Sequence, residues 1–287
     1  MKSYSCPNCG AQIVTDGTTV ATSCPYCANP TVIPGKLEGQ KKPDMVIPFR
    51  LNKDQAIQQL KMHYKGKKLL PDTFRDQNHL EEIKGVYVPF WLSDSEVNVD
   101  MDLNASQNTV SRMGNQEITR TRHYSLERSR KLRFEHVPVD GSSKMPDDYM
   151  DSIAPFDFQE LKEFSTAYLP GFFADIYDVS AEDCITRAEE SMQTSAREAV
   201  LQSVGQYGNV TVAREQLDIQ RGKISYALLP VWMLSTRWNG QVYLFAMNGQ
   251  TGKMVGDLPV SRAKYWQNFA SIMIPVAVLL GIALYFI

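Results

Sequence analysis

Four cysteines near the start of the chain are the residues whose type and spacing indicate a definite chemistry. They form two pairs, with two residues inside each pair and fourteen residues between the pairs: Cys6, Cys9, Cys24 and Cys27. Two thiolates at this spacing can face one ion, and two such pairs complete the tetrahedral four-sulfur shell that zinc favours. The spacing therefore predicts one structural Zn²⁺ ion as cofactor, with no coordination position left open for a substrate.

An iron site of the rubredoxin type and a redox-active dithiol are the alternatives to zinc at these cysteines. Rubredoxin-type sites use similar pairs, whereas a dithiol needs only one of the two pairs present. Between the pairs, residues 12–14 and 18–22 are expected to pair as strands about Asp16-Gly17. A segment this short has little core, so metal binding supplies most of its folding energy. We predict a zinc ribbon over residues 1–35.

A zinc measurement on the purified full-length chain tests the ribbon. We expect about one zinc ion per chain, and loss of that ion in the Cys6→Ser, Cys9→Ser double variant, because two thiolates cannot close the shell. Mass spectrometry of the metal content gives the stoichiometry. A Cys184→Ser variant is the matched control and should keep its zinc. Purified wild-type protein without stoichiometric zinc would contradict the prediction.

The rest of the chain contains no familiar catalytic motif. The sequence has no phosphate-binding loop, no dinucleotide-binding glycine pattern and no nucleophile elbow, and its four histidines lack H-x-x-x-H spacing: His63, His79, His123 and His136. Cys184 is expected to be a small core residue at the start of a helix, with a reactive thiolate as the alternative. The chain is therefore predicted not to be an enzyme, and no small-molecule substrate is evident.

The C-terminal end of the chain is strongly apolar. Residues 269–287 carry no charge, and at about 1.5 Å per residue they nearly cross a hydrocarbon core of roughly 30 Å. Tyr265 and Trp266 lie where an interfacial aromatic belt belongs, and Arg262 and Lys264 favour a cytosolic N-terminal side. We predict a transmembrane anchor over residues 263–287 in a single-pass cell-membrane protein whose body faces the cytoplasm. A buried core helix is the alternative.

The segment between ribbon and anchor, residues 36–262, has the patterning of an α+β body. Hydrophobic residues make up 43% of the chain and charged residues 22%, which suits a globular core. Asn52 and Ser180 are expected to cap helices over residues 53–64 and 180–204. Short strands over residues 84–92, 96–101, 116–124 and 131–139 predict an antiparallel meander. Further strands are expected over residues 216–219 and 223–234, with Arg221-Gly222 between them. A weak echo between residues 87–92 and 226–233 fits a duplicated helix-plus-strands unit and coincidence equally well.

Charge is distributed unevenly along this body. Residues 111–135 hold seven Arg or Lys and three Glu, and residues 140–183 hold eleven Asp or Glu and two Lys. The cations of this basic run are Arg112, Arg120, Arg122, Arg128, Arg130, Lys131 and Arg133. There are three interpretations of this distribution. The two segments are oppositely charged solvated faces that complement each other across the fold, or the basic segment contacts anionic headgroups, or it contacts nucleic acid. The net charge of -2 excludes polyanion binding by the chain as a whole.

Six segments resemble a bacterial family of zinc-ribbon-containing proteins of the transcription factor IIB type: CPNCGAQI, CPYCANP, IKGVYVPFW, VPVDGSSKM, YALLPVWML and FAMNGQTGKMVGDLPV. The resemblance covers nearly the whole chain and supports the four zinc ligands and the membrane tail. Members often carry the label of a primosomal helicase, but the sequence lacks the phosphate-binding loop and the acidic magnesium motif that a helicase needs. Residues 243–255 also resemble the strand–turn–strand of PepSY-like modules.

These features together predict a non-enzymatic, membrane-tethered protein. The zinc ribbon is expected to dock another protein, the body to act as a binding or scaffold module, and the tail to anchor both. A nucleic-acid-associated factor that uses the ribbon and the basic strands is the alternative.

Overall fold

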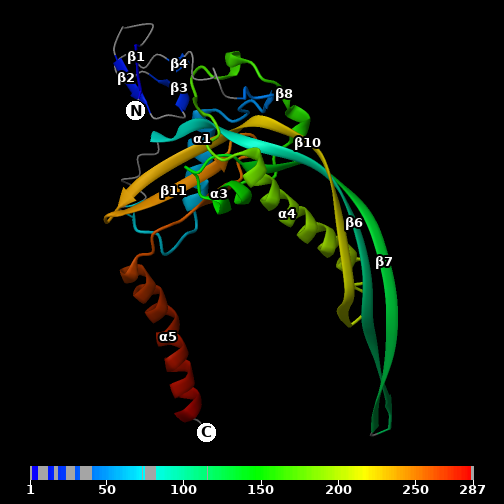
Figure 1. Cartoon of the computed structure of the whole chain (residues 1–287). Helices are drawn as coiled ribbons and strands as arrows, with labels where there is room; N and C mark the ends of the chain where they lie inside the picture. Colours follow the sequence, from blue (N-terminus) through cyan, green and yellow to red (C-terminus); the bar gives the residue numbers. More distant parts are fainter. Residues whose placement is uncertain are drawn as a thin grey trace.

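Three very long strands organise the structure (Figure 1). The computed structural model describes residues 2–5, 12–15, 19–23, 30–32, 41–72, 74, 82–114 and 116–285. In it, β6 (Lys84–Met113) lies between β7 (Gln116–Asp140) and β10 (Asn209–Trp238), and both neighbours run antiparallel to it. Their far halves leave the body as a curved ribbon. We call this ribbon the arm, and it comprises residues 95–134 and 209–221.

Shorter elements complete a ten-stranded sheet and cover it. The order β12-β11-β10-β6-β9-β3-β4 forms the main path of this sheet, with β7 on β6, β5 on β10 and β8 on the other edge of β5. Its shorter strands are β3 (Thr19–Ser23), β4 (Pro30–Val32), β5 (Met45–Val46), β8 (Lys162–Glu163), β9 (Phe173–Asp175), β11 (Gln241–Asn248) and β12 (Met254–Gly256). β1 (Lys2–Ser5) and β2 (Gln12–Thr15) form a separate two-stranded sheet. The helices are α1 (Lys53–Tyr64), α3 (Asp147–Ser152), α4 (Ala181–Gln202) and α5 (Arg262–Tyr285).

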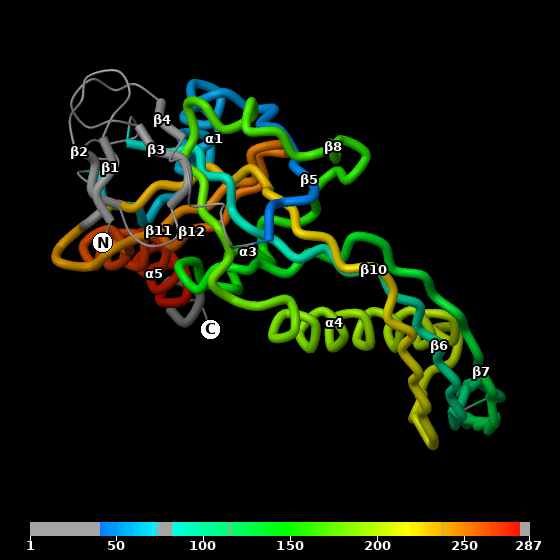
Figure 2. Tube along the Cα trace, turned by 45° about the horizontal axis from the view of Figure 1, so that its top comes forward, coloured from blue at the N-terminus to red at the C-terminus, as the bar shows by residue number. Residues whose placement is uncertain are grey.

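Each covering helix makes its own hydrophobic cluster. α4 runs along one face of the arm (Figures 1 and 2), where its Ala188, Met192 and Val200 pack in the cluster that includes Val99 and Met101 of β6. α3 packs on the body end of the sheet, and α1 covers β10 and β11. Residues 95–105 of β6 alternate between buried and less buried positions because α4 covers one face of the arm, whereas residues 87–92 are buried on both faces of the sheet.

Two prolines lie inside the central strands without breaking them. Pro89 falls between the residues of β6 that pair with β9 and those that pair with β7, and Pro230 falls between the residues of β10 that pair with β5 and those that pair with β11. Proline cannot donate a ladder hydrogen bond, so a position where the neighbouring strand changes tolerates it. Each carbonyl is still used, by Gly141 N at Pro89 and by Gly249 N at Pro230.

Two helix predictions are confirmed. α1 begins after Asn52, whose side chain accepts from Gln55 N at 2.9 Å, while the Asn52 backbone N–H donates to Gln55 Oε1 at 2.9 Å. α4 begins after Ser180, whose hydroxyl accepts from Asp183 N. Such caps satisfy the unpaired amides of a first helical turn and depend only on local sequence.

The predicted meander is wrong, because its strands are continuous. The residues expected as four separate strands form only β6 and β7, and the sequence Arg221-Gly222 lies within β10. The pairing of β6 and β10 shifts register between Arg221 and Ile224. A Cβ on Gly222 would lie 2.8 Å from the Asp94 carbonyl oxygen, so this glycine permits the close approach of a bulge and does not mark a turn.

The N-terminal strands differ from the predicted ribbon. β1 pairs with β2, whereas β3 pairs with β4 and, at its other edge, with β9 of the body. The predicted pairing of residues 12–14 with residues 18–22 is therefore wrong. The sheet of the body is also mixed and not purely antiparallel, because β9 runs parallel to β6 and β5 runs parallel to β10.

The predicted membrane anchor is corrected by the structure. α5 spans Arg262–Tyr285 and begins with a polar stretch that includes Lys264 and Asn268. Among the residues described, no helix has both the length and the apolar character needed to cross a membrane. The transmembrane fold class and the single-pass membrane localisation are therefore wrong.

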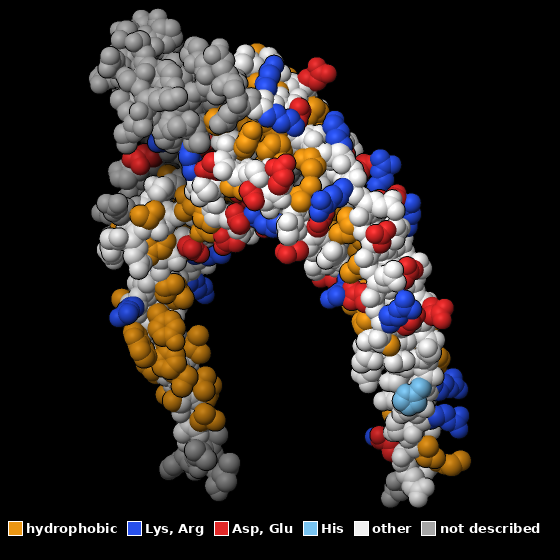
Figure 3. Space-filling view, in the orientation of Figure 1, with side chains coloured by type: hydrophobic (Ala, Val, Ile, Leu, Met, Phe, Trp, Pro, Cys, Tyr) orange, Lys and Arg blue, Asp and Glu red, His pale blue; other side chains and the backbone are white. Residues whose placement is uncertain are grey.

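α5 instead forms a second projection from the body. Lys264 Nζ donates to the Leu70 carbonyl at 2.8 Å and pairs with Asp72 at 2.7 Å, which ties the first turns of the helix to the chain after α1. Beyond these contacts, large apolar side chains of the helix are exposed, including Trp266 and Leu279 (Figure 3).

Candidate functional site

The predicted zinc ligands lie outside the described residues. In the sequence Cys6 and Cys9 fall between β1 and β2, and Cys24 and Cys27 fall between β3 and β4. The part of the chain that is described holds no group of three or more His, Cys, Asp or Glu side chains able to bind a metal. The zinc ribbon of the predicted fold class thus has no counterpart there, and zinc at the four cysteines stays a prediction.

Cys184 is a core residue. Its side chain is buried on α4, and its Sγ donates to the Asp140 carbonyl oxygen at 3.4 Å. Burial, and then the charge of Asp140, raises the pKa of the Cys184 thiol to about 11. Because the thiolate is the nucleophilic form, this thiol is unreactive near neutral pH.

The described histidines are kept apart. His63 lies on α1, where burial and then Lys67 lower its pKa. The ring of His136 stacks on Phe158 at 5.5 Å, and its backbone N–H donates to Asp94 Oδ1 at 2.8 Å. His123 lies on the arm, and His79 is outside the described residues. The structure therefore places no two of the three described histidines in a common site.

Arg187 is the centre of an ionic cluster that the sequence did not reveal. From α4 its guanidinium reaches Asp147 at 2.8 Å and Asp151 at 2.9 Å on α3, and Asp140 at 3.3 Å at the end of β7. One cation thus joins three elements and faces three carboxyl groups. The sequence signal that could have indicated this cluster is the position of Arg187, shortly after residues 140–183, which hold eleven Asp or Glu and only two Lys.

Asp140 is the unusual member of this cluster. Its side chain is 1% exposed, and within the described chain neither carboxyl oxygen has a hydrogen-bond donor in good geometry. Burial raises the pKa of Asp140 to about 6, and the nearby charge of Arg187 offsets part of that rise. Asp147 raises the pKa further, because a second negative charge disfavours ionisation.

A pocket of about 260 Å³ opens beside the cluster. Its lining is mainly apolar, with the Arg187–Asp151 ion pair at one side: Val137, Pro138, Val139, Met150, Asp151, Ala154, Arg187 and Ser191. Arg187 is engaged by carboxylates, so the polar side of this pocket is acidic. The arrangement suits an apolar side chain flanked by cations.

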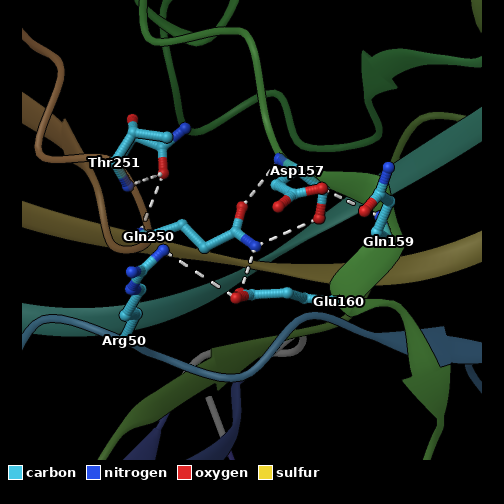
Figure 4. A network of polar contacts seen from close by, with 7 residues as sticks. Arg50, Asp157, Gln159, Glu160, Gln250 and Thr251 are labelled. Atoms are coloured by element: carbon cyan, nitrogen blue, oxygen red, sulfur yellow. Dashed lines mark hydrogen bonds and ion pairs between the residues drawn. The ribbon is translucent and has the colours of Figure 1, made fainter.

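A second polar network fixes the turn between β11 and β12 (Figure 4). Gln250 accepts from Asp157 N at 2.9 Å and donates to the Asp157 carbonyl and to Glu160, which also faces Arg50. Asn248 is fully buried, and its side chain accepts from two backbone N–H groups of this turn and donates to the carbonyls of Ile153 and Pro155 after α3. Every polar group of these two amides is satisfied, so the network has the character of a structural lock.

The arm carries the basic run, but its strand geometry divides that run. Successive residues of β7 point alternately toward α4 and away from it. Residues that pair directly across the β6–β7 ladder lie on the same face. The α4 face of the arm receives Arg120, Arg122, Arg128 and Arg130. The opposite, outer face receives Arg112, Lys131 and Arg133, and each of these is paired, with Glu117, Glu96 and Glu135 respectively. The seven cations therefore do not form one continuous basic track.

The end of the arm is a bare two-stranded hairpin. β10 reaches only as far as Asn209, opposite Ser106, so β6 and β7 continue alone over residues 107–122, which we call the tip. Its α4 face presents Met113, Ile118, Arg120 and Arg122, and the two apolar side chains are 76% and 47% exposed. Neither arginine makes an ion pair with any described residue.

A known protein aligns with the chain along nearly its whole length. Over 319 aligned residues the chain is 35% identical to the uncharacterized protein YdjG of Bacillus subtilis (strain 168), and the match covers 94% of each chain. No family model matches the chain, and no solved structure matches it. The name of the relative specifies no activity, ligand or partner, so it adds no residue to the site.

Proposed function

Because the chain belongs to the family of the Bacillus subtilis protein YdjG, along whose length it aligns almost completely, we propose a function that its whole architecture can serve. The protein is a non-enzymatic protein-binding or scaffold module, and the arm is its contact surface. The observation that carries this proposal is the tip, which exposes apolar and cationic side chains together at the end of a long projection.

The energetics of the tip support a binding role. An isolated two-stranded hairpin is only marginally stable in water. Apolar side chains that stay exposed to water add no hydrophobic stabilisation to it. Val110 is 55% exposed on the outer face, as Met113 and Ile118 are exposed on the α4 face. Burying such side chains against a partner contributes about 25 cal/mol per Å² of apolar surface, before the cost of association.

A nucleic-acid-associated role is the weaker candidate. The basic run is split between two faces, and the three cations of the outer face are already paired. The tip contains no aromatic side chain on which a base could stack. Binding of single-stranded DNA that weakens steeply with salt would nevertheless favour this candidate over the protein-binding one.

Site-specific crosslinking in cells tests the proposed contact surface. We expect a photo-crosslinking amino acid in place of Met113 to give a discrete product, and the same amino acid in place of Met62 to give none. Met62 is the matched control, since it is a 65% exposed methionine on α1. The Arg120→Glu, Arg122→Glu variant should lower the yield from position 113 by about tenfold, because reversed charges oppose the encounter.

The crosslinked species is identified by mass spectrometry, and its binding is then measured with both purified proteins. Equal products from positions 62 and 113, or a yield that the charge reversal leaves unchanged, would contradict a role for the tip.

A further inference from the structure

We propose that the tip of one copy docks on the acidic face of a second copy, so that two chains form a closed dimer. The acidic face comprises Asp147, Asp148 and Asp151 of α3 with Glu182 and Asp183 of α4. This inference rests on the proposed function, because it names the partner of the same arm.

The tip carries positive charge that no described carboxylate of its own chain pairs with. On its α4 face the ladder places Gln107, Thr109, Ser111 and Met113 of β6 opposite Arg122, Arg120, Ile118 and Gln116 of β7. No carboxylate lies on this face of the hairpin. Its one acidic residue, Glu117, is on the other face and pairs with Arg112 at 3.4 Å. The α4 face of the tip therefore carries two unpaired positive charges beside two apolar side chains.

The acidic face has the opposite imbalance. Its five carboxylates are exposed, and Arg187 is the cation that binds two of them, at Asp147 and Asp151. Asp148 and Glu182 make no ion pair with any described residue. The pocket of about 260 Å³, which Asp151 and Arg187 help to line, has a mainly apolar lining and room for one methionine side chain. The chemistry of this face thus complements both the arginines and Met113 of the tip.

The two surfaces cannot meet within one chain. No ion pair among the described residues joins a cation of residues 111–135 to a carboxylate of residues 140–183. Figures 1 and 2 show the reason, because the tip lies at the far end of the arm from α3. In the space-filling view, acidic side chains lie along the underside of the body, between the arm and α5, with basic side chains among them (Figure 3). A second copy can present this surface to the tip.

A reciprocal arrangement uses the contact twice. If each arm reaches the acidic face of the other chain, two identical contacts form for a single loss of translational and rotational freedom. Such a pair is closed by a two-fold axis and does not extend into a filament. Because the contact depends on exposed charges, it weakens as salt shortens the screening length.

Sedimentation equilibrium of the full-length chain tests the dimer. We expect a dimer at an ionic strength of about 0.05 M whose dissociation constant rises at least about tenfold at 0.5 M, because the Debye length falls severalfold. The Arg120→Glu, Arg122→Glu variant and the Asp148→Lys, Glu182→Lys variant should each raise the dissociation constant by about tenfold or more. A chain with all four substitutions restores opposite charges in both contacts and should dimerise again.

The Arg112→Glu variant is the matched control, because Arg112 lies in the same hairpin on the opposite face, and it should leave the dimer unchanged. A chain that stays monomeric at low salt would overturn the inference. So would an assembly that ignores both salt and the charge reversals, which is the behaviour expected of contacts through the apolar side chains of α5. Either result leaves the proposed function open to the separate crosslinking experiment at Met113.

Discussion

The Asn248→Ala variant is expected to lose about 3–4 kcal/mol of its free energy of unfolding. Asn248 is fully buried at the end of β11, and its side chain donates to the carbonyls of Ile153 and Pro155 at 3.1 and 3.2 Å. The side-chain oxygen of Asn248, Oδ1, accepts from the backbone N–H groups of Gln250 and Thr251 at 2.9 and 3.0 Å. Alanine leaves these four backbone groups without partners, at about 1 kcal/mol each.

The effect should exceed that of losing one contact, because Asn248 joins two parts of the body through four hydrogen bonds. It holds the turn after β11 against the chain that follows α3, and Gln250 continues the same junction to Asp157. Urea unfolding followed by tryptophan fluorescence measures the loss. Asn104→Ala is the matched control, since Asn104 is exposed on the outer face of the arm and should cost less than about 0.5 kcal/mol. Similar losses in the two variants would contradict the role assigned to this network.

Elements that depend on local sequence could be predicted. Asn52 and Ser180 cap α1 and α4 through residues three positions away, so the amino-acid sequence contains the whole signal. The long strands could not be bounded in the same way. Gly222 is typical of a turn in the sequence, but in the structure it allows β10 to pass close to Asp94 within one continuous strand. Pairing with β6 over distant residues keeps that strand extended.

The sequence shows where charged residues lie along the chain, but it does not show which charged residues pair in the fold. The sequence shows a basic run and an acidic run, but only the ladder between β6 and β7 assigns Arg120 and Arg122 to one face and Arg112 to the other. Arg187 meets Asp140 from another element, at a sequence distance over which no pattern operates. The cluster around Arg187 is therefore a tertiary feature, and its electrostatics depend on burial that composition does not reveal.

Asp140 offers the most direct measurement of that burial. Its folded-state pKa of about 6 lies above the ordinary aspartate value of 3.8, so the folded chain binds this proton more tightly than the unfolded chain does. The contribution of Asp140 to stability therefore falls as pH rises from about 4 to about 6, and the cost stays in full above that range. At 1.36 kcal/mol per pKa unit, the cost at neutral pH is about 3 kcal/mol.

The Asp140→Asn variant removes this cost, because the amide fills the same space and carries no charge. We expect the variant to be about 2–3 kcal/mol more stable than the wild type at pH 8, and nearly equal to it at pH 4, where the wild-type carboxyl is protonated. The attraction of Arg187 does not reverse this sign, since it already lowers the pKa of Asp140 within the net value. Thermal unfolding of both proteins across this pH range measures the difference. Asp148→Asn, on the exposed side of α3, should change stability little at either pH. An Asp140→Asn variant less stable than the wild type at pH 8 would show that the ion pair with Arg187 outweighs the burial of its carboxylate.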